Sequence, residues 1–298
     1  MKFTFENIIG KFLNQDNQIS PSNIENNHKK LEELEINQLK PILKHFKNPI
    51  FYQKFKEENK LITIKAIRED VNEDNLIIQA IANLNELDKT SNLLVKRLRE
   101  WFSLYLPEVD NRIHSNEKFV EIVLENNREK LIEDFNITNS MGKNLEQPHY
   151  DQIILLAKQV ETIYELRLKH EEYLHTIMKT YCPNFLELAG TTIAAKLLEL
   201  ARNLKHLAML PASTVQLLGA EKALFRHIKT GSKSPKHGII FQHPLIQKTK
   251  KQNRGKAARA LADKLSICAR IDFFKGEFRA NIYKEELNKK FLGEVNNE

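Results

Sequence analysis

The sequence predicts a mainly α-helical protein with a small N-terminal α/β domain, an antiparallel coiled-coil hairpin and a compact helical C-terminal domain. Only nine of the 298 residues are glycine, which argues against a sandwich or barrel rich in glycine turns. Charged residues make up 29% and hydrophobic residues 41%, a balance typical of long helices with wide solvated faces. The length exceeds a single compact core, and we place three domains at residues 1–85, 86–182 and 183–298.

Residues 1–85 carry the weakest pattern in the chain, because short apolar alternations stand among Asn, Glu and Lys. The segment LITIKAI, Leu61–Ile67, alternates and is rich in β-branched side chains, which predicts a strand. We therefore expect a small α/β domain here.

The middle of the chain has helical periodicity. Apolar residues recur at steps of three and four from Asp88 until Pro107 interrupts them. A second helix is expected over 117–135 and a third over 151–181, with a break at 140–148. Because a short polar loop joins the last two helices, they predict an antiparallel coiled-coil hairpin.

The third helix contains a continuous heptad seam whose members alternate in spacing between three and four residues. They are Ile153, Leu156, Val160, Ile163, Arg167, His170, Leu174, Ile177 and Tyr181. The polar pair Arg167 and His170 either fixes the register of the hairpin or meets a partner. Periodicity alone leaves open whether the seam is filled within the hairpin or by a second copy of the chain.

Beyond Pro183 the composition shifts toward Ala and Leu, as in compact buried helices. Helices are expected over 191–210, 220–229 and 257–274, and Gly231 is placed to end the second of these. In that second helix one face is apolar and is expected to point inward, and the opposite face is basic. The apolar residues are Ala223, Leu224 and Ile228, and the basic residues are Lys222, Arg226 and Lys229.

Positive charge is concentrated between Gly219 and Arg259. Eleven basic side chains and one acidic side chain, Glu221, give this segment a formal charge of +10, whereas the whole chain carries +7. Lys222 and Arg226 lie one helical turn apart and repel each other by about 0.3 kcal/mol. A phosphate bound between them would turn this repulsion into a net attraction. Clustered Lys and Arg indicate contact with nucleic acid, although a solvated basic face is equally consistent with charge alone.

Glu221 and three histidines, His227, His237 and His243, permit several kinds of chemistry. A histidine can stack on an unpaired RNA base, act as a general acid or base in a nuclease, or fill an ordinary structural place. Their spacing matches no standard zinc pattern, and no phosphate-binding or dinucleotide-binding glycine motif is present. The sequence therefore predicts no catalytic residue, no metal and no cofactor.

The two cysteines, Cys182 and Cys268, are far apart and support neither a disulfide framework nor a paired-cysteine zinc site. The N-terminus lacks a sustained apolar signal, and no window of about 18 apolar residues occurs. We expect a soluble intracellular protein without a membrane partner.

Five segments in order carry a family resemblance. They are RLREWFSLYLPEV (Arg97–Val109), SMGKNL (140–145), AMLPASTVQLL (Ala208–Leu218), GAEKALFRHIKTG with PKHGIIFQHPLI (219–246), and ARALADKLSICARID (Ala258–Asp272). Together they resemble the Nop domain and coiled coil of the core scaffold protein of archaeal box C/D small ribonucleoproteins and its eukaryotic nucleolar relatives. The chain departs from that pattern at residues 193–196, where a glycine is usual, and at 247–256, where charge replaces aromatic residues.

The resemblance implies a non-enzymatic scaffold with three modules. The N-terminal domain would dock a fibrillarin-type methyltransferase, the coiled coil would form a homodimer, and the Nop domain would grip a kink-turn guide RNA that already holds a ribosomal-type protein. It would guide 2′-O-methylation of ribosomal or transfer RNA, in the archaeal cytoplasm, or in the nucleolus if the chain is eukaryotic. The RNA-binding residues implied by the resemblance and the charge cluster are Glu221, Lys222, Arg226, His227, Lys229, Lys233, Lys236, His237, Gln242, His243, Lys256 and Arg259.

Three alternatives remain open at this point. A spliceosomal-type Nop-domain protein would bind a kink turn in a small nuclear RNA, although the full GAEKALF string argues against it. A stand-alone RNA-modifying enzyme or nuclease would use Glu221 and the histidines. A purely structural coiled-coil protein would not retain RNA in a salt-dependent way.

Overall fold

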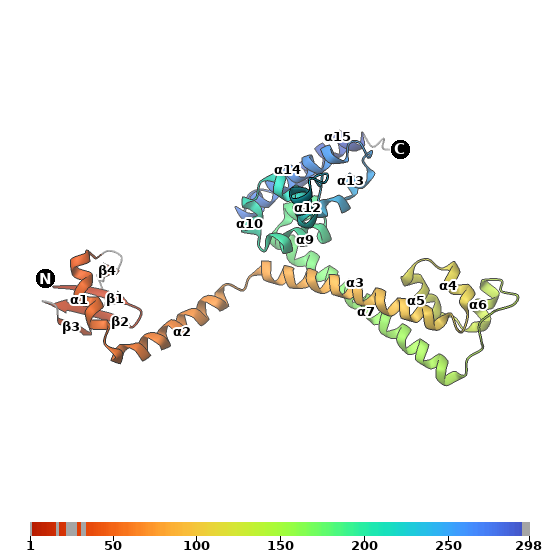
Figure 1. Cartoon of the computed structure of the whole chain (residues 1–298), viewed down its shortest axis with the longest axis horizontal. Helices are drawn as coiled ribbons and strands as arrows, with labels where there is room; N and C mark the ends of the chain where they lie inside the picture. Colours follow the sequence, from red (N-terminus) through yellow and green to blue (C-terminus); the bar gives the residue numbers. More distant parts are fainter. Residues whose placement is uncertain (1, 16–17, 22–28, 31–33, 294–298) are drawn as a thin grey trace. The chain divides into compact units, whose positions relative to one another are not determined.

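The computed structural model describes residues 2–15, 18–21, 29–30 and 34–293. Its contacts divide the chain into two units, Met1–Asn72 and Glu73–Glu298, which are described separately (Figure 1). The predicted fold class, mainly α with a small N-terminal α/β domain, is confirmed. The division falls upstream of the predicted boundary at residue 85, because the long helix that begins at Glu73 lies entirely within the second unit.

The first unit is a four-stranded sheet with helices, and the strand order is β3-β2-β1-β4. β1 is antiparallel to β2 and parallel to β4. Phe5, Phe12, Leu34 and Ile42 form its buried core, and the Phe46 ring meets Phe12 edge-on at 4.9 Å between centroids. The elements are β1 (Lys2–Asn7), β2 (Gly10–Gln15), β3 (Gln18–Pro21), β4 (Lys29–Lys30), α1 (Ile36–Phe46), the short helix η2 (Pro49–Phe51) and α2 (Tyr52–Glu69).

The strand predicted over Leu61–Ile67 is wrong, because these residues lie inside α2. The β-branched run is flanked by Lys, Glu, Gln and Leu, which favour a helix over the full 18-residue segment. Strand preference depends mainly on neighbouring strands to pack against, and none of the described strands pairs with this segment.

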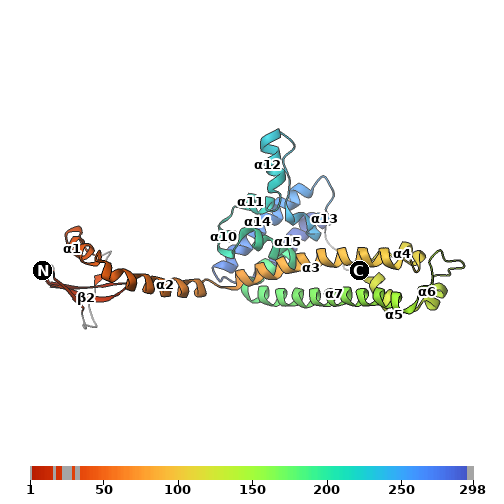
Figure 2. The same cartoon turned by 60° about the horizontal axis from the view of Figure 1, so that its bottom comes forward.

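The second unit begins with an antiparallel pair of long helices, α3 and α7 (Figure 2). The sequence predicted that the helices over 117–135 and 151–181 pair as a hairpin. This prediction is wrong, because α7 pairs with α3 instead. Three short helices, rather than a short polar loop, join the two long ones. The second predicted helix is split where Asn127 caps a new helix by accepting from the backbone N–H of Lys130. The bounds are α3 (Glu73–Phe102), α4 (Pro107–Arg112), α5 (Asn116–Glu125), α6 (Arg128–Asp134) and α7 (Gln147–Tyr181).

The polar pair of the heptad seam is satisfied within this hairpin. The Arg167 guanidinium contacts the Asp88 carboxylate of α3 at 2.5 Å and Glu171 at 3.0 Å. The imidazole of His170 lies 3.5 Å from the amide nitrogen of Asn83. Both residues therefore help to set the register of α7 against α3, which is one of the two interpretations that the sequence left open.

The C-terminal helical domain is built around α14. Its apolar face, which includes Ala257, Leu261 and Leu265, is fully buried. The single helix predicted over 191–210 is divided, because Arg202 adopts a left-handed conformation and Asn203 caps the next helix. The elements are α8 (Pro183–Ala189), α9 (Thr191–Ala201), α10 (Leu204–Met209), α11 (Ala212–Leu217), α12 (Glu221–Thr230), the short helix η3 (Ile239–Gln242), α13 (Pro244–Lys248), α14 (Arg254–Phe273) and α15 (Ala280–Leu292).

A buried polar cluster joins three of these helices. The Asp272 carboxylate of α14 accepts from the backbone N–H groups of Asn184 and Phe185 at the start of α8, and from the Asn184 side-chain amide at 2.8 Å. The carbonyl oxygen of that amide accepts from the backbone N–H groups of Arg279 and Ala280, where α15 begins. Burial raises the pKa of Asp272, and these hydrogen bonds oppose the shift.

Candidate nucleic-acid interface

Helix α12 projects from the rest of the C-terminal domain (Figure 2). All of its residues are described by the structure, and none of them is buried. Phe225 is 70% exposed and Ile228 71% exposed. The prediction that Ala223, Leu224 and Ile228 point inward is wrong, since two of them are exposed and Leu224 is half-buried. The apolar spacing is present, but the described chain supplies nothing for this face to pack against.

A short pair of backbone hydrogen bonds holds the base of this projection. The N–H of Gly238 donates to the Gln216 carbonyl, and the N–H of Ile239 donates to the Leu218 carbonyl, both at 2.8 Å. The Gln216 side-chain amide adds a third bond, to the Lys236 carbonyl at 2.6 Å. These three bonds tie the start and the end of residues 219–238 together, so the position of α12 is set mainly at its base.

Two glycines make this base possible. Gly219 has a φ of +83°, which glycine adopts without strain. At Gly238 an added Cβ would lie 1.9 Å from the Leu218 carbonyl oxygen, which is far inside contact distance. Glu221 also supports the turn, because its carboxylate accepts from the backbone N–H of Gly219 at 2.7 Å. Gly231 ends α12 in a left-handed conformation, as the sequence predicted.

The basic side chains of α12 are free to meet an anion. Lys222, Arg226 and Lys229 are exposed and form no ion pair with any residue that the structure describes. Lys233 is exposed on the loop that follows. Since none of the described carboxylates pairs with these cations, the local field stays positive and favours a polyanion.

His227 and His237 occupy structural places beside the loop. The Nδ1 atom of His227 bonds to the Ser232 carbonyl, which holds the loop against the end of α12. The His237 ring stacks on Phe241 with centroids 4.3 Å apart and planes 16° apart. The Arg254 guanidinium lies over Phe241 at 5.7 Å. Burial lowers the pKa of His237, which favours the neutral ring at pH 7.

His243 is engaged at both ring nitrogens. Its Nδ1 accepts from the backbone N–H of Leu245 and so caps α13, and its Nε2 lies 2.9 Å from the Leu188 carbonyl. A carbonyl only accepts, so Nε2 carries the proton. Burial lowers the pKa of this ring as well. His243 therefore joins α13 to α8, whereas the neighbouring Gln242 is exposed.

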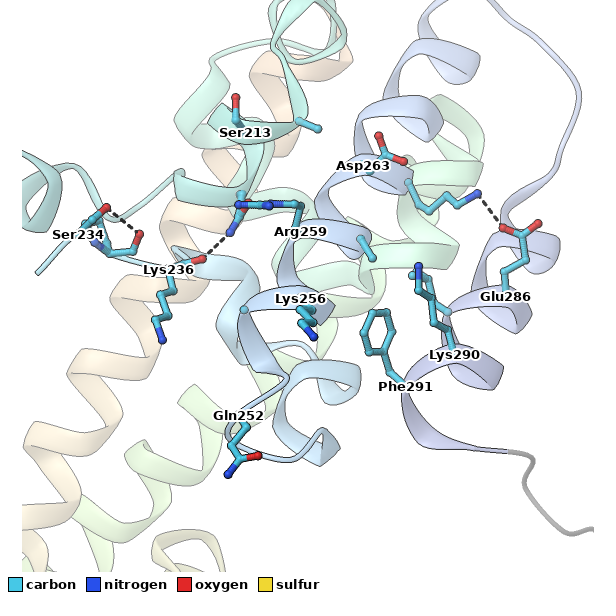
Figure 3. Close-up of a pocket in the computed structure, with 17 residues that line it drawn as sticks. Ser213, Ser234, Lys236, Gln252, Lys256, Arg259, Asp263, Glu286, Lys290 and Phe291 are labelled. Carbon is cyan, nitrogen blue, oxygen red and sulfur yellow. Dashed lines mark hydrogen bonds and ion pairs between the residues drawn. The ribbon is translucent and has the colours of Figure 1, made fainter.

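A basic cavity of about 1310 Å³ lies beside the loop, between α11, α14 and α15 (Figure 3). Three of the predicted residues, Lys236, Lys256 and Arg259, line it. The structure thus places eight of the twelve predicted residues in two regions. Glu221, Lys222, Arg226, His227 and Lys229 lie on α12, and the three cavity residues lie at its foot. Sequence reasoning did not find Phe225, whose exposure follows from the missing packing partner rather than from any local pattern.

This fold and site define a mainly helical protein with an exposed cationic face. Residues 83–296 match the Nop family, described as "snoRNA binding domain, fibrillarin". The chain is 42% identical, over 233 residues, to an uncharacterized NOP5 family protein of Methanocaldococcus jannaschii, covering 73% of this chain and 56% of that protein. It is 36% identical to nucleolar protein 56 of Caenorhabditis elegans over 239 residues, covering 72% and 49% respectively. The chain belongs to the Nop family, and the resemblance seen in the sequence is confirmed.

The chain spans about half the length of the curated relatives it matches. A chain in the crystal structure of a fibrillarin/Nop5p complex aligns with 97% of this chain and 98% of its own, at 25% identity and a TM-score of 0.47.

Among the helices that the structure describes, none is long and apolar enough to cross a membrane. The described His, Cys, Asp and Glu residues do not gather into a group of three that could hold a metal ion.

Replacing Gly238 by Ala should displace the base of α12. The new Cβ would meet the Leu218 carbonyl oxygen, so two backbone hydrogen bonds would be lost at about 1 kcal/mol each. We expect the free energy of unfolding of the second unit to fall by about 2 kcal/mol, which corresponds to about 4–8 °C in Tm by calorimetry. Gly255→Ala is the matched control, because its Cβ would lie 3.8 Å from Lys236 in ordinary contact. Equal Tm values for the two variants would contradict this account.

Proposed function

We propose that this chain is a non-catalytic scaffold of a box C/D guide ribonucleoprotein. Its Nop domain binds kink-turn RNA together with a ribosomal-type protein, and the chain positions a fibrillarin-type methyltransferase for 2′-O-methylation of ribosomal or transfer RNA. Membership of a family described by snoRNA binding and fibrillarin supports this class of function. The observation that carries it is α12, a projecting helix whose cations form no ion pair within the described chain and whose Phe225 and Ile228 side chains are exposed.

The two kinds of side chain on α12 fit a composite surface of RNA and protein. Lys222, Arg226 and Lys229 suit phosphates, which supply most of the affinity and position the protein without reading sequence. Phe225 and Ile228 are large apolar side chains that gain nothing from contact with water or phosphate. Their exposure suits contact with an apolar patch on the ribosomal-type protein. Binding would therefore require both components at once.

The methyl donor and the chemistry belong to the methyltransferase in this proposal. The chain contributes orientation, which lowers a barrier by holding the enzyme and the guide-selected ribose in reacting geometry. The first unit, residues 1–72, would dock the enzyme. With relatives in an archaeon and among nucleolar proteins, we place the chain in the archaeal cytoplasm, or in the nucleolus if it is eukaryotic.

A homodimer through the coiled coil completes the proposal. Three apolar residues of α7, Leu155, Leu166 and Tyr173, are 54%, 42% and 46% exposed. Their separations of 11 and 7 residues are close to three and two helical turns, so they share one face. That face is distinct from the one that carries Val160 and Leu174, which are fully buried. A second copy of the chain would cover this stripe.

Reconstitution with purified components tests the scaffold role. The chain alone, incubated with guide RNA, target RNA and S-adenosylmethionine, should transfer no methyl group. Adding the methyltransferase and the ribosomal-type protein should give methylation at the guided ribose, and omitting the chain should abolish it. Methyl transfer or RNA cleavage by the chain alone would instead identify it as an enzyme.

Arg226→Ala should weaken assembly on kink-turn RNA by about tenfold, because one charge-assisted phosphate contact is lost. Tm should stay unchanged, since the Arg226 side chain is exposed and forms no ion pair with any described carboxylate. Binding is measured by gel shift in the presence of the ribosomal-type protein. Arg97→Ala, which removes an exposed arginine from α3, is the control. A large fall in Tm for Arg226→Ala would show a structural role instead.

Leu166→Glu should convert the dimer to a monomer, because it places a charge in the middle of the stripe on α7. Sedimentation velocity would report the change in mass, and circular dichroism should show unchanged helix content. Lys179→Glu introduces the same side chain at an exposed position on another face of α7 and should leave the dimer intact. A wild-type chain that sediments as a monomer at micromolar concentration would refute the dimer.

A further inference from the structure

The cavity beside α12 is also lined by residues of α15, the last helix of the described chain. Lys290 and Phe291 of α15 line the side opposite Lys236, and Lys256 and Arg259 of α14 lie between (Figure 3). Lys256 and Arg259 are three residues apart and so share one face of their helix. The cavity thus has cations from two helices and one loop around a common space.

The charge in this space is positive and largely unneutralised. Five cationic side chains and two carboxylates line the cavity. One cation and one carboxylate already neutralise each other, because the Lys264 ammonium lies 2.7 Å from the Glu286 carboxylate. The remaining four cations, Lys236, Lys256, Arg259 and Lys290, form no ion pair within the described chain. Only Asp263 opposes them, so the cavity favours an anion with several charges.

Apolar side chains also line the cavity. They are Ala260 of α14 and Leu287 and Phe291 of α15, and Leu287 is only 4% exposed. A phosphate alone would gain nothing from this surface. A nucleic-acid strand offers both parts, since its phosphates meet cations and its riboses and bases pack on apolar and aromatic side chains. The bases of a duplex are already stacked and paired, so they would not be free to pack on these side chains.

We propose that this groove, lined by Lys236, Lys256, Arg259, Lys290 and Phe291, binds a single-stranded RNA segment that extends from the RNA held by α12. Lys236 connects the two sites, because it stands on the loop that follows α12 and also lines the cavity. The inference rests on the proposed function and extends the RNA footprint to α15. At about 1310 Å³ the cavity exceeds the usual 300–1,000 Å³ of small-molecule sites, which suits several nucleotides.

Binding of three RNAs by the full chain, in the presence of the ribosomal-type protein, tests the groove. One is a kink-turn RNA without overhangs, and the other two carry a single-stranded uridine extension of roughly ten nucleotides, one at the 5′ end and one at the 3′ end. Fluorescence anisotropy at several salt concentrations gives the Kd and its salt dependence. We expect the wild-type chain to bind one of the extended RNAs about tenfold more tightly than the RNA without overhangs.

Lys290→Glu should remove most of that gain and reduce the salt slope for the extended RNA by about one unit. It should change the Kd of the unextended RNA by less than about twofold. Lys289→Glu is the matched control, because it makes the same charge change on α15 at an exposed residue that does not line the cavity. Circular dichroism melting confirms that both variants are folded.

The outcomes separate the two proposals. Equal wild-type affinity for extended and unextended RNAs, or equal loss with Lys289→Glu and Lys290→Glu, would overturn the groove and leave the kink-turn proposal standing. Failure of the wild-type chain to bind any of the RNAs would overturn the kink-turn proposal and the groove together.

Discussion

The backbone link at the foot of α12 is the constraint on which the functional account depends. Helix α12 buries none of its side chains, so packing does not fix its direction. Its direction is set by the hydrogen bonds between residues 216–219 and 236–239. Two backbone hydrogen bonds and the Gln216 side chain hold that junction, and Gly238 allows the two segments to approach. The cations and the exposed apolar residues of α12 therefore both face outward. The apolar side chains stay in contact with water until a partner covers them.

The rest of the second unit gives that junction a firm base. Asp272 and Asn184 connect α8, α14 and the start of α15 through buried hydrogen bonds. The Asp74 carboxylate accepts from the Tyr181 hydroxyl at 2.9 Å and from the backbone N–H of Leu204 at 3.0 Å, which ties the long helices α3 and α7 to the C-terminal domain. Buried polar groups of this kind are costly when broken, so the helices that carry the basic residues keep a defined arrangement.

Sequence reasoning succeeded where a local signal determines the structure and failed where a distant partner does. Gly231 as the end of α12 and the charge cluster of residues 219–259 could both be read directly. The inward face of α12 could not, because apolar spacing shows which side chains share a face but not whether the chain covers them. Leu61–Ile67 was misassigned for the same reason, since a strand needs neighbours. The capping role of His243 also depends on Leu188, far away in the sequence.

Amide hydrogen exchange of residues 219–238 tests the central claim most directly. In the free chain α12 should exchange faster than α14, because it has no tertiary packing to protect it. With kink-turn RNA and the ribosomal-type protein bound, its exchange should slow by at least about tenfold, since a covered helix opens less often, while α5 should be unchanged. Exchange in α12 that is the same with and without these partners would contradict the account.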